Sequence, residues 1–159
     1  FVSSAYSFAL DGVPHTYDAV PSESEQKLQT ALASQFSWLA NNSGFYVAQC
    51  NQELHDRIAF DAIHGITATA NGFYGPQGRS VRLKSNMENR IDEYAAFRHD
   101  GLRVTNFEME SAGIYAMASM LGHKALSVCA ILVNRATKEF NSDALRSVET
   151  LIRTVLERF

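Results

Sequence analysis

Three segments of the chain carry polar side chains of the kinds that bind and polarise a small molecule. Gln77 and Arg79 end a glycine-rich stretch, Glu108 and Glu110 open a helical pattern, and Arg135 follows a long apolar run. An amide both donates and accepts hydrogen bonds, a guanidinium donates five, and a carboxylate only accepts. Brought together, these groups would form a site for a small polar ligand and would stabilise negative charge on it.

Glu110 is the most unusual of these residues. A helix predicted over 108–121 would place Ile114, Met117 and Leu121 on one apolar stripe, and Glu110 lies one turn before Ile114 on the same stripe. A carboxylate directed at a core is unfavourable unless it is paired or hydrogen-bonded. Glu110 is therefore expected to face inward, either as a functional group or as a structural partner of a buried arginine. Thr105 and Glu108 fit a capping box at the start of this helix, which alone would explain Glu108.

The other two segments have structural alternatives as well. Glycines and a proline shape a tight turn around Gln77 and Arg79, which an ordinary surface loop with an exposed arginine would also explain. The adjacent aromatics Phe73 and Tyr74 suit a flat ligand, but they could instead anchor the loop to the core. An ion pair with an acidic residue would account equally for Arg135.

Strands alternate with helices along the chain, which predicts βαβ units around a mainly parallel sheet. Apolar and turn patterns predict strands over 2–8, 45–48, 66–70, 102–105 and 124–133, and helices over 22–39, 51–59, 86–98, 108–121 and 142–159. The strand over 124–133 is expected to be buried on both faces. In the last helix, the apolar residues Leu145, Val148, Ile152, Val155 and Phe159 are expected to be buried.

The fold class predicted from this order is α/β, a three-layer αβα sandwich around a mostly parallel or mixed sheet, in a single domain spanning 1–159. Ligands of open α/β sheets bind beyond the carboxyl ends of the strands. The segments with Gln77 and Arg79, with Glu108 to Glu110, and with Arg135 all follow strand ends. We therefore expect them to meet at one edge of the sheet.

Composition narrows the class of protein. Of the 159 residues, 46% are hydrophobic and 19% are charged, as is usual for a globular protein. The net charge is −3, so the overall charge does not suggest a nucleic-acid partner. Cys50 and Cys129 lack the spacing of a zinc site or a disulfide framework. No segment reaches the roughly 20 apolar residues of a membrane span, and no signal peptide is recognisable. We expect a cytoplasmic protein without a membrane partner, and, because an apolar strand starts at Phe1, sequence upstream of it.

At the same residues the chain resembles the uridine phosphorylases of the nucleoside phosphorylase superfamily. The resemblance spans essentially the whole chain and rests on GITATANGFYGPQGR over 65–79, NFEMESA over 106–112 and ILVNR over 131–135. It implies the nucleoside-phosphorylase-like fold, present here in part.

The resemblance implies a role for each site residue. Gln77 would match the N3–H and O2 edge of uracil, Arg79 would bind O4, and Arg135 would assist nearby. Phe73 would pack against the base, with Leu132 and Val133 lining the pocket. Glu110 would accept the ribose 2′ and 3′ hydroxyls, supported by Met109 and Glu108. Gln77, Arg79 and Glu110 are the expected catalytic residues.

The reaction implied is that of a pentosyltransferase of pyrimidine salvage: uridine and phosphate give uracil and ribose 1-phosphate. Inorganic phosphate is the co-substrate, and no cofactor or metal is implied, because side chains that bind the charge developing on uracil suffice. Purine-cleaving members use an aspartate after the last buried strand as a general acid. Here Asn134 and Arg135 stand there, and an arginine is no general acid at neutral pH, which favours pyrimidines.

The family's phosphate site lies mostly in an N-terminal part that this sequence lacks. We therefore expect the chain to be the nucleoside-recognition part of the enzyme and inactive by itself. Sites shared between subunits in the family imply a homo-oligomer, a dimer or a hexamer built from dimers. Two alternatives remain: a hydrolase of the same fold, in which water replaces phosphate, and a non-catalytic nucleoside-binding protein.

Overall fold

The computed structural model describes residues 1–87 and 90–159 of the chain. In chain order its elements are β1 (Val2–Ala9), η1 (Val13–Tyr17), α1 (Glu23–Gln35), α2 (Ser37–Ala40), β2 (Tyr46–Gln49), α3 (Gln52–Ile58), β3 (Ile63–Thr69), η2 (Gly75–Gln77), α4 (Glu88–Ala96), β4 (Val104–Glu108), α5 (Ser111–Met120), β5 (Val128–Cys129), β6 (Val133–Asn134), β7 (Glu139–Phe140) and α6 (Ala144–Arg158).

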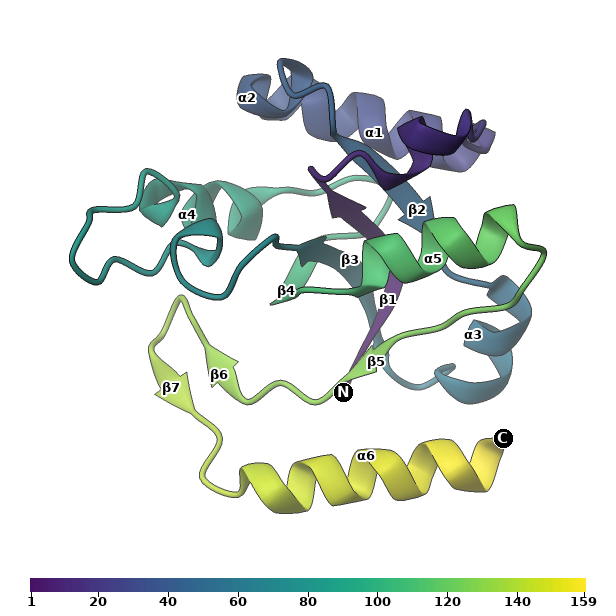
Figure 1. Cartoon of the computed structure of the whole chain (residues 1–159). Helices are drawn as coiled ribbons and strands as arrows, with labels where there is room; N and C mark the ends of the chain where they lie inside the picture. The colour runs from purple at the N-terminus through teal and green to yellow at the C-terminus, as the bar shows by residue number, and fades with distance from the viewer.

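A mixed five-stranded sheet forms the centre of the molecule (Figure 1). β1, β3 and β4 are parallel neighbours, and β2 runs antiparallel beside β1. The edge of β1 that faces away from β3 is shared by two strands. β2 pairs with its second half, and β5 pairs with Val2 and Ser3 at its start. Helices pack on both faces of this sheet, so the predicted three-layer α/β fold is confirmed.

One face of the sheet is covered by α1, α2 and α4 through an apolar, aromatic-rich core. Phe8 and Ile66 of the sheet pack there with Leu32 of α1, Leu39 of α2 and Tyr94 of α4. The helix predicted from residue 22 is confirmed, because Ser22 and Glu25 form the expected capping box. The chain then bends at Phe36 into α2, so the predicted helical run is divided in two.

The opposite face, beneath α5, is lined by small and hydroxyl-bearing side chains. The Ser4 Oγ lies 2.5 Å from the Thr67 Oγ1, which donates to the Asn106 Oδ1 at 2.8 Å. The Tyr115 hydroxyl of α5 donates to the backbone oxygen of Ser4 at 2.8 Å. Because hydroxyls can donate and accept at once, they form a continuous buried network. This face leads along β3 and β4 towards the candidate site.

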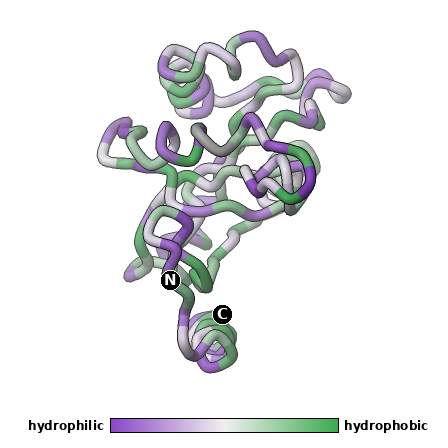
Figure 2. Tube along the Cα trace, turned by 90° about the vertical axis from the view of Figure 1, so that its left-hand side faces the viewer, coloured by the Kyte–Doolittle hydropathy of each residue, from purple (hydrophilic) through white to green (hydrophobic). Residues whose placement is uncertain are grey.

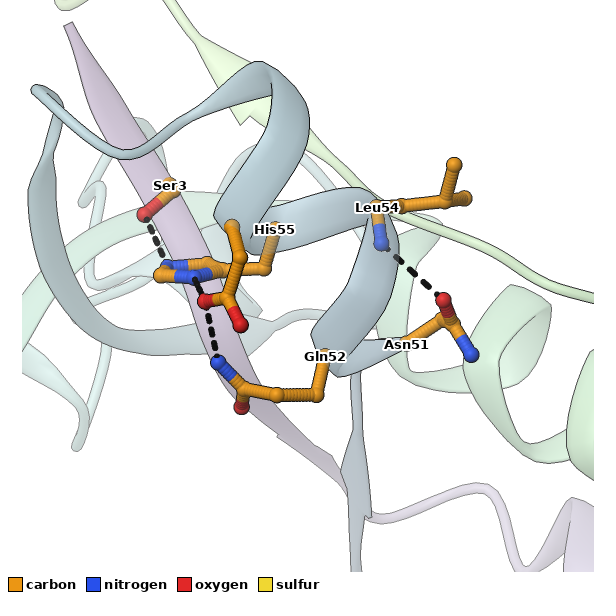
Figure 3. A network of polar contacts seen from close by, with 6 residues as sticks. Ser3, Asn51, Gln52, Leu54 and His55 are labelled. Atoms are coloured by element: carbon orange, nitrogen blue, oxygen red, sulfur yellow. Dashed lines mark hydrogen bonds and ion pairs between the residues drawn. The ribbon is translucent and has the colours of Figure 1, made fainter.

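Helix α3 is anchored beside the start of β1 (Figure 3). The Asn51 side chain caps it by accepting from the backbone N–H of Leu54 at 3.0 Å. The buried His55 ring lies 3.2 Å from the Ser3 Oγ through its Nε2 and 3.3 Å from the Asp56 Oδ1 through its Nδ1. Ser3 is fully buried on β1, so this chain of contacts fixes the helix to the sheet.

The boundary between β4 and α5 differs from the prediction. The strand was expected to end at Thr105, yet it continues to Glu108, and the helix starts at Ser111. Thr105 is an extra residue in the pairing with β3, and its hydroxyl donates to the backbone oxygen of Ile66 at 3.3 Å. The expected capping box of Thr105 and Glu108 is therefore wrong, because pairing with β3 keeps both residues extended.

The C-terminal third differs most. The buried strand predicted over 124–133 is wrong: only β5 pairs with the main sheet, while β6 forms a hairpin with β7. Helix α6 is present, but none of its residues is buried, and Leu145 and Ile152 are exposed. Figures 1 and 2 show this helix set apart below the sheet. The predicted burial of Leu145, Val148, Ile152, Val155 and Phe159 is therefore wrong, because no other layer of the described chain covers the apolar face of this helix.

Candidate active site

The loop after β3 is held in a closed turn that presents Gln77 and Arg79. Gly78 adopts φ 73°, a left-handed conformation that glycine tolerates without strain, and it ends the short helix η2. Gln77 is 5% exposed, and the Arg79 Nη1 donates to its Oε1 at 2.7 Å. The Arg79 guanidinium also stacks on the Phe73 ring, 3.8 Å from the centroid. The loop therefore fixes its own polar groups.

The aromatic pair of this loop remains accessible. Phe73 is 53% exposed, and its ring meets that of Tyr74 edge to face with centroids 5.3 Å apart. Neither ring is buried in the core, so the two aromatics do not anchor the loop to the core. Because one face of Phe73 is occupied by Arg79, a ligand would contact the pair from the outer side.

Glu108 ends β4, and its carboxylate accepts three hydrogen bonds from its surroundings. Its Oε2 accepts from the backbone N–H groups of Glu110 at 2.7 Å and Ser111 at 2.6 Å. Its Oε1 accepts from the Thr69 hydroxyl at 2.5 Å. The carboxylate thus caps α5 from the strand that precedes it, a role close to the capping predicted for Glu108 but in a different geometry.

Glu110 is exposed, and the prediction that it faces inward is wrong for this chain. It stands just before the helix with φ −134° and ψ −35°, so it does not continue the helical stripe. Helix α5 buries Ala112, Tyr115 and Ala116 instead, while Ile114 is 54% exposed. The Glu110 Oε2 accepts from the backbone N–H of Met109 at 3.2 Å, and Met109 is also exposed.

Arg135 follows β6 and reaches back to β4. Its guanidinium lies 5.7 Å from the centroid of the Phe107 ring, and its Nη1 is buried without a hydrogen-bond partner among the described residues. Burial lowers the pKa of Arg135, and the charge of Arg79 lowers it further. A desolvated guanidinium with a free donor is unfavourable by itself, so this position is suited to an incoming acceptor.

The two remaining predicted site residues lie in the same hairpin. Leu132 is half-exposed, and Val133 pairs with Phe140 of β7.

The three segments meet at one edge of the sheet. Thr69 and Glu108 are paired neighbours at the ends of parallel β3 and β4, so the loop after β3 and residues 109–110 leave side by side. The Arg135 guanidinium lies 5.7 Å from the ring centroid of Phe107 in β4, so the third segment reaches the same strand. Two hollows of the molecule lie away from this edge, one between η1, α1 and α2 and one along α6. Phe73, Tyr74 and Met109 are exposed at the edge, which gives the site an open rim.

Comparison with known proteins decides the family. The model of the phosphorylase superfamily matches residues 15–159. The chain belongs to the phosphorylase superfamily. The uridine phosphorylase of Thermococcus kodakarensis is 42% identical over 79 residues, which cover 48% of this chain and 27% of that protein. The inactive uridine phosphorylase B of Schistosoma mansoni is 39% identical over 74 residues, 45% of this chain and 24% of that protein.

The fold of this superfamily member also matches a solved structure. A nucleoside phosphorylase of Trypanosoma brucei superposes with a TM-score of 0.82 and 22% sequence identity, over 99% of this chain and 56% of that one. At this identity the match supports the fold. The chain spans well under two thirds of the length of these relatives. None of its described helices has the length and apolar composition needed to cross a membrane.

Thr69 and Phe107 belong to the site but were missed by sequence reasoning. The Thr69 hydroxyl donates a hydrogen bond to the Glu108 carboxylate, and the Phe107 ring lies near the guanidinium of Arg135. One signal was available: Thr69 is the last residue of its strand before the glycine-rich loop. The described residues contain no group of three or more His, Cys, Asp or Glu side chains placed to hold a metal ion.

Proposed function

We propose that the protein is a uridine phosphorylase, which converts uridine and phosphate reversibly to uracil and ribose 1-phosphate. The observation that carries the proposal is the buried, unpaired donor of Arg135 beside Phe107 of β4, at the edge where the segments with Gln77, Arg79 and two glutamates leave the sheet. Cleavage of the glycosidic bond leaves negative charge on the pyrimidine. Two guanidinium groups would bind that charge more tightly than the neutral base, which lowers the barrier.

Gln77 is arranged to read the base. Arg79 occupies one lone pair of its Oε1 and thereby sets the orientation of the amide. The second lone pair is left to accept from N3–H of uracil, and the amide nitrogen is left to donate to a ring carbonyl. Phe73 would lie against the base, and Leu132 and Val133 would line the hairpin side of the pocket.

The sugar would be held by the segment after β4. A carboxylate on a ribose diol accepts two hydrogen bonds, and Glu110 is the exposed carboxylate at this edge. Asn134 does not offer the acid that purine cleavage would need, because a carboxamide has no proton that it can release near neutral pH. Its Oδ1 accepts from the backbone N–H groups of Ala136 and Thr137. Pyrimidine nucleosides are therefore the proposed substrates.

Relatives named uridine phosphorylase support this proposal, including the one from Thermococcus kodakarensis. A second candidate is a nucleoside-binding protein without turnover. The relative from Schistosoma mansoni is named an inactive uridine phosphorylase, so proteins similar to this chain include one without that activity.

Release of uracil from uridine tests the proposal. The protein expressed from its complete coding sequence is incubated with uridine with and without phosphate, with inosine as the purine control, and uracil and ribose 1-phosphate are quantified. If the protein is a uridine phosphorylase, uracil is released only when phosphate is present, and its amount equals that of ribose 1-phosphate. Uracil without phosphate identifies a hydrolase. Uridine binding in calorimetry without product at saturating phosphate identifies the binding protein, and no binding refutes all three.

A further inference from the structure

Thr69 joins three structural segments through one hydroxyl. It is the last residue of β3, directly before the loop that carries Gln77 and Arg79, and its side chain is buried. Its Oγ1 donates to the Glu108 Oε1 at 2.5 Å and accepts from the backbone N–H of Ala112 at 3.1 Å. A single hydroxyl therefore links β3, the end of β4 and the first turn of α5.

The backbone of Glu110 depends on this link. The first N–H groups of a helix have no partner within the helix. In α5 the Glu108 Oε2 accepts from the N–H groups of Glu110 and Ser111, and Thr69 accepts from the next one, of Ala112. Glu110 has no side-chain hydrogen bond to its own helix. Its exposed carboxylate accepts from the backbone N–H of the preceding Met109, so its direction follows the backbone segment that Thr69 and Glu108 hold.

All three contacts of the Glu108 carboxylate point into the protein. Each of its oxygens is engaged by a donor of β3 or α5, and these charge-assisted hydrogen bonds are of the strong kind. Three of the roughly four acceptor positions of a carboxylate are thus taken, which leaves about one for any other donor. Glu108 is accordingly better suited to shape the sugar site than to contact the sugar.

We propose that Thr69 is a positioning residue for the sugar: through Glu108 it orients Glu110 towards the ribose hydroxyls, and Glu108 itself does not touch the substrate. The inference rests on the proposed function, since Glu110 is assigned to the ribose there. It adds that recognition of the sugar depends on a threonine that belongs to the strand before the base-binding loop.

Paired substitutions in β3 test the proposal. T69V removes the hydroxyl at nearly constant volume, T69S retains it, and T67V makes the same change two residues earlier on the same face. The Thr67 hydroxyl is bonded to Asn106 rather than to Glu108, so T67V is a matched control for loss of a buried hydroxyl. Binding of uridine and of 2′,3′-dideoxyuridine, which lacks both ribose hydroxyls, is measured by calorimetry.

T69V should weaken uridine binding about tenfold, in the range of one charge-assisted hydrogen bond, and leave dideoxyuridine binding unchanged. T69S should restore uridine binding, and T67V should preserve the ratio of the two affinities. Equal weakening of both ligands in T69V, or a changed ratio in T67V, would mean that the hydroxyl only supports the fold and would overturn the proposal.

Amide hydrogen exchange gives a second readout that needs no ligand. Exchange at the N–H groups of Glu110 and Ser111 should accelerate in T69V and return to the wild-type rate in T69S. Unchanged exchange in T69V overturns the positioning role itself. If the wild type binds neither nucleoside while exchange responds as expected, the proposed function fails and the sugar-directed part of the inference fails with it, but the link from Thr69 to Glu110 is retained.

Discussion

Arg79 is held in place before any ligand arrives. Its guanidinium contacts the Gln77 amide and the Phe73 ring and carbonyl, so three parts of one short loop are fixed by one side chain. A group that is already oriented loses little conformational entropy when a ligand binds. At the scale of single residues, the loop would therefore offer the base of the proposed substrate a pre-formed set of contacts.

Removal of this guanidinium should be costly for binding and mild for folding. We expect R79A to weaken uridine binding by about ten- to a hundredfold, because a charge-assisted hydrogen bond and the orientation of Gln77 are both lost. Calorimetry gives the affinity, and thermal unfolding gives the stability. R82A changes an exposed arginine three residues later and should alter neither. An R79A protein that binds uridine like wild type contradicts the assignment of the loop.

Arg135 should show the opposite balance between stability and binding. Folding buries its guanidinium without a partner for Nη1, which opposes folding in the absence of a ligand. R135M keeps a long side chain over Phe107 but removes the charge. We expect its melting temperature to equal or exceed that of wild type, while its affinity for uridine falls.

The control for this prediction is R103M, which removes an exposed arginine. It should leave both quantities unchanged. A lower melting temperature for R135M with unchanged uridine affinity would mean that Arg135 is a structural residue.

At the scale of elements, locally encoded features could be predicted and features set by neighbours could not. Ser22 and Glu25 predicted the start of α1 because both partners of the capping box lie within four residues. Thr105 and Glu108 have the same spacing, but pairing with β3 determines their conformation. Sequence spacing cannot distinguish the two cases. The placement of Gln77, Arg79 and Glu108 at the ends of strands could be predicted, whereas the exposure of Glu110 could not.

Helix α6 is fixed to the body at its C-terminal end. Arg158 donates to both carboxylate oxygens of Asp61, at 2.6 Å and 2.7 Å, and to the backbone oxygen of Ile58 at 2.8 Å. The hydrogen bond from Arg158 lowers the pKa of Asp61. This lowered pKa makes the attachment of the helix sensitive to acid.

A carboxyl group with a lowered pKa stabilises the fold above its unfolded-state pKa, about 3.9 for aspartate, and this contribution is lost as the pH falls through the lower folded-state value. We therefore expect D61N to melt below the wild type at neutral pH, and the difference to shrink below about pH 4. Melting curves of both proteins across this range check it. E149Q, an exposed carboxylate on the same helix, should match the wild type throughout. A difference that does not depend on pH would contradict the role of the Asp61 charge.

At the scale of the whole molecule, large apolar side chains remain uncovered along α6. Leu145, Ile152 and Leu156 are all more than half exposed, and Leu145 reaches 72%. Exposed apolar patches of this kind mark interaction surfaces or aggregation risk. Their burial was predicted from periodicity, which identifies an apolar face but cannot say whether the same chain covers it.

We expect this surface to drive association between copies of the chain. The double variant I152E/L156E should shift sedimentation towards the monomer, because two charges would have to be desolvated in any apolar interface. T150E adds a charge at an exposed polar position of the same helix and should leave sedimentation unchanged. If the double variant sediments like wild type, α6 is not part of the contact.

The aromatic layer beneath α1 and α2 provides a spectroscopic probe of folding. It contains Trp38, the one tryptophan of the sequence, which packs against Phe36, Tyr94 and the guanidinium of Arg90. Indole emission depends on the polarity around the ring, so the molecule carries a built-in optical probe of this layer. Loss of the layer could be followed by fluorescence in any variant with no added label.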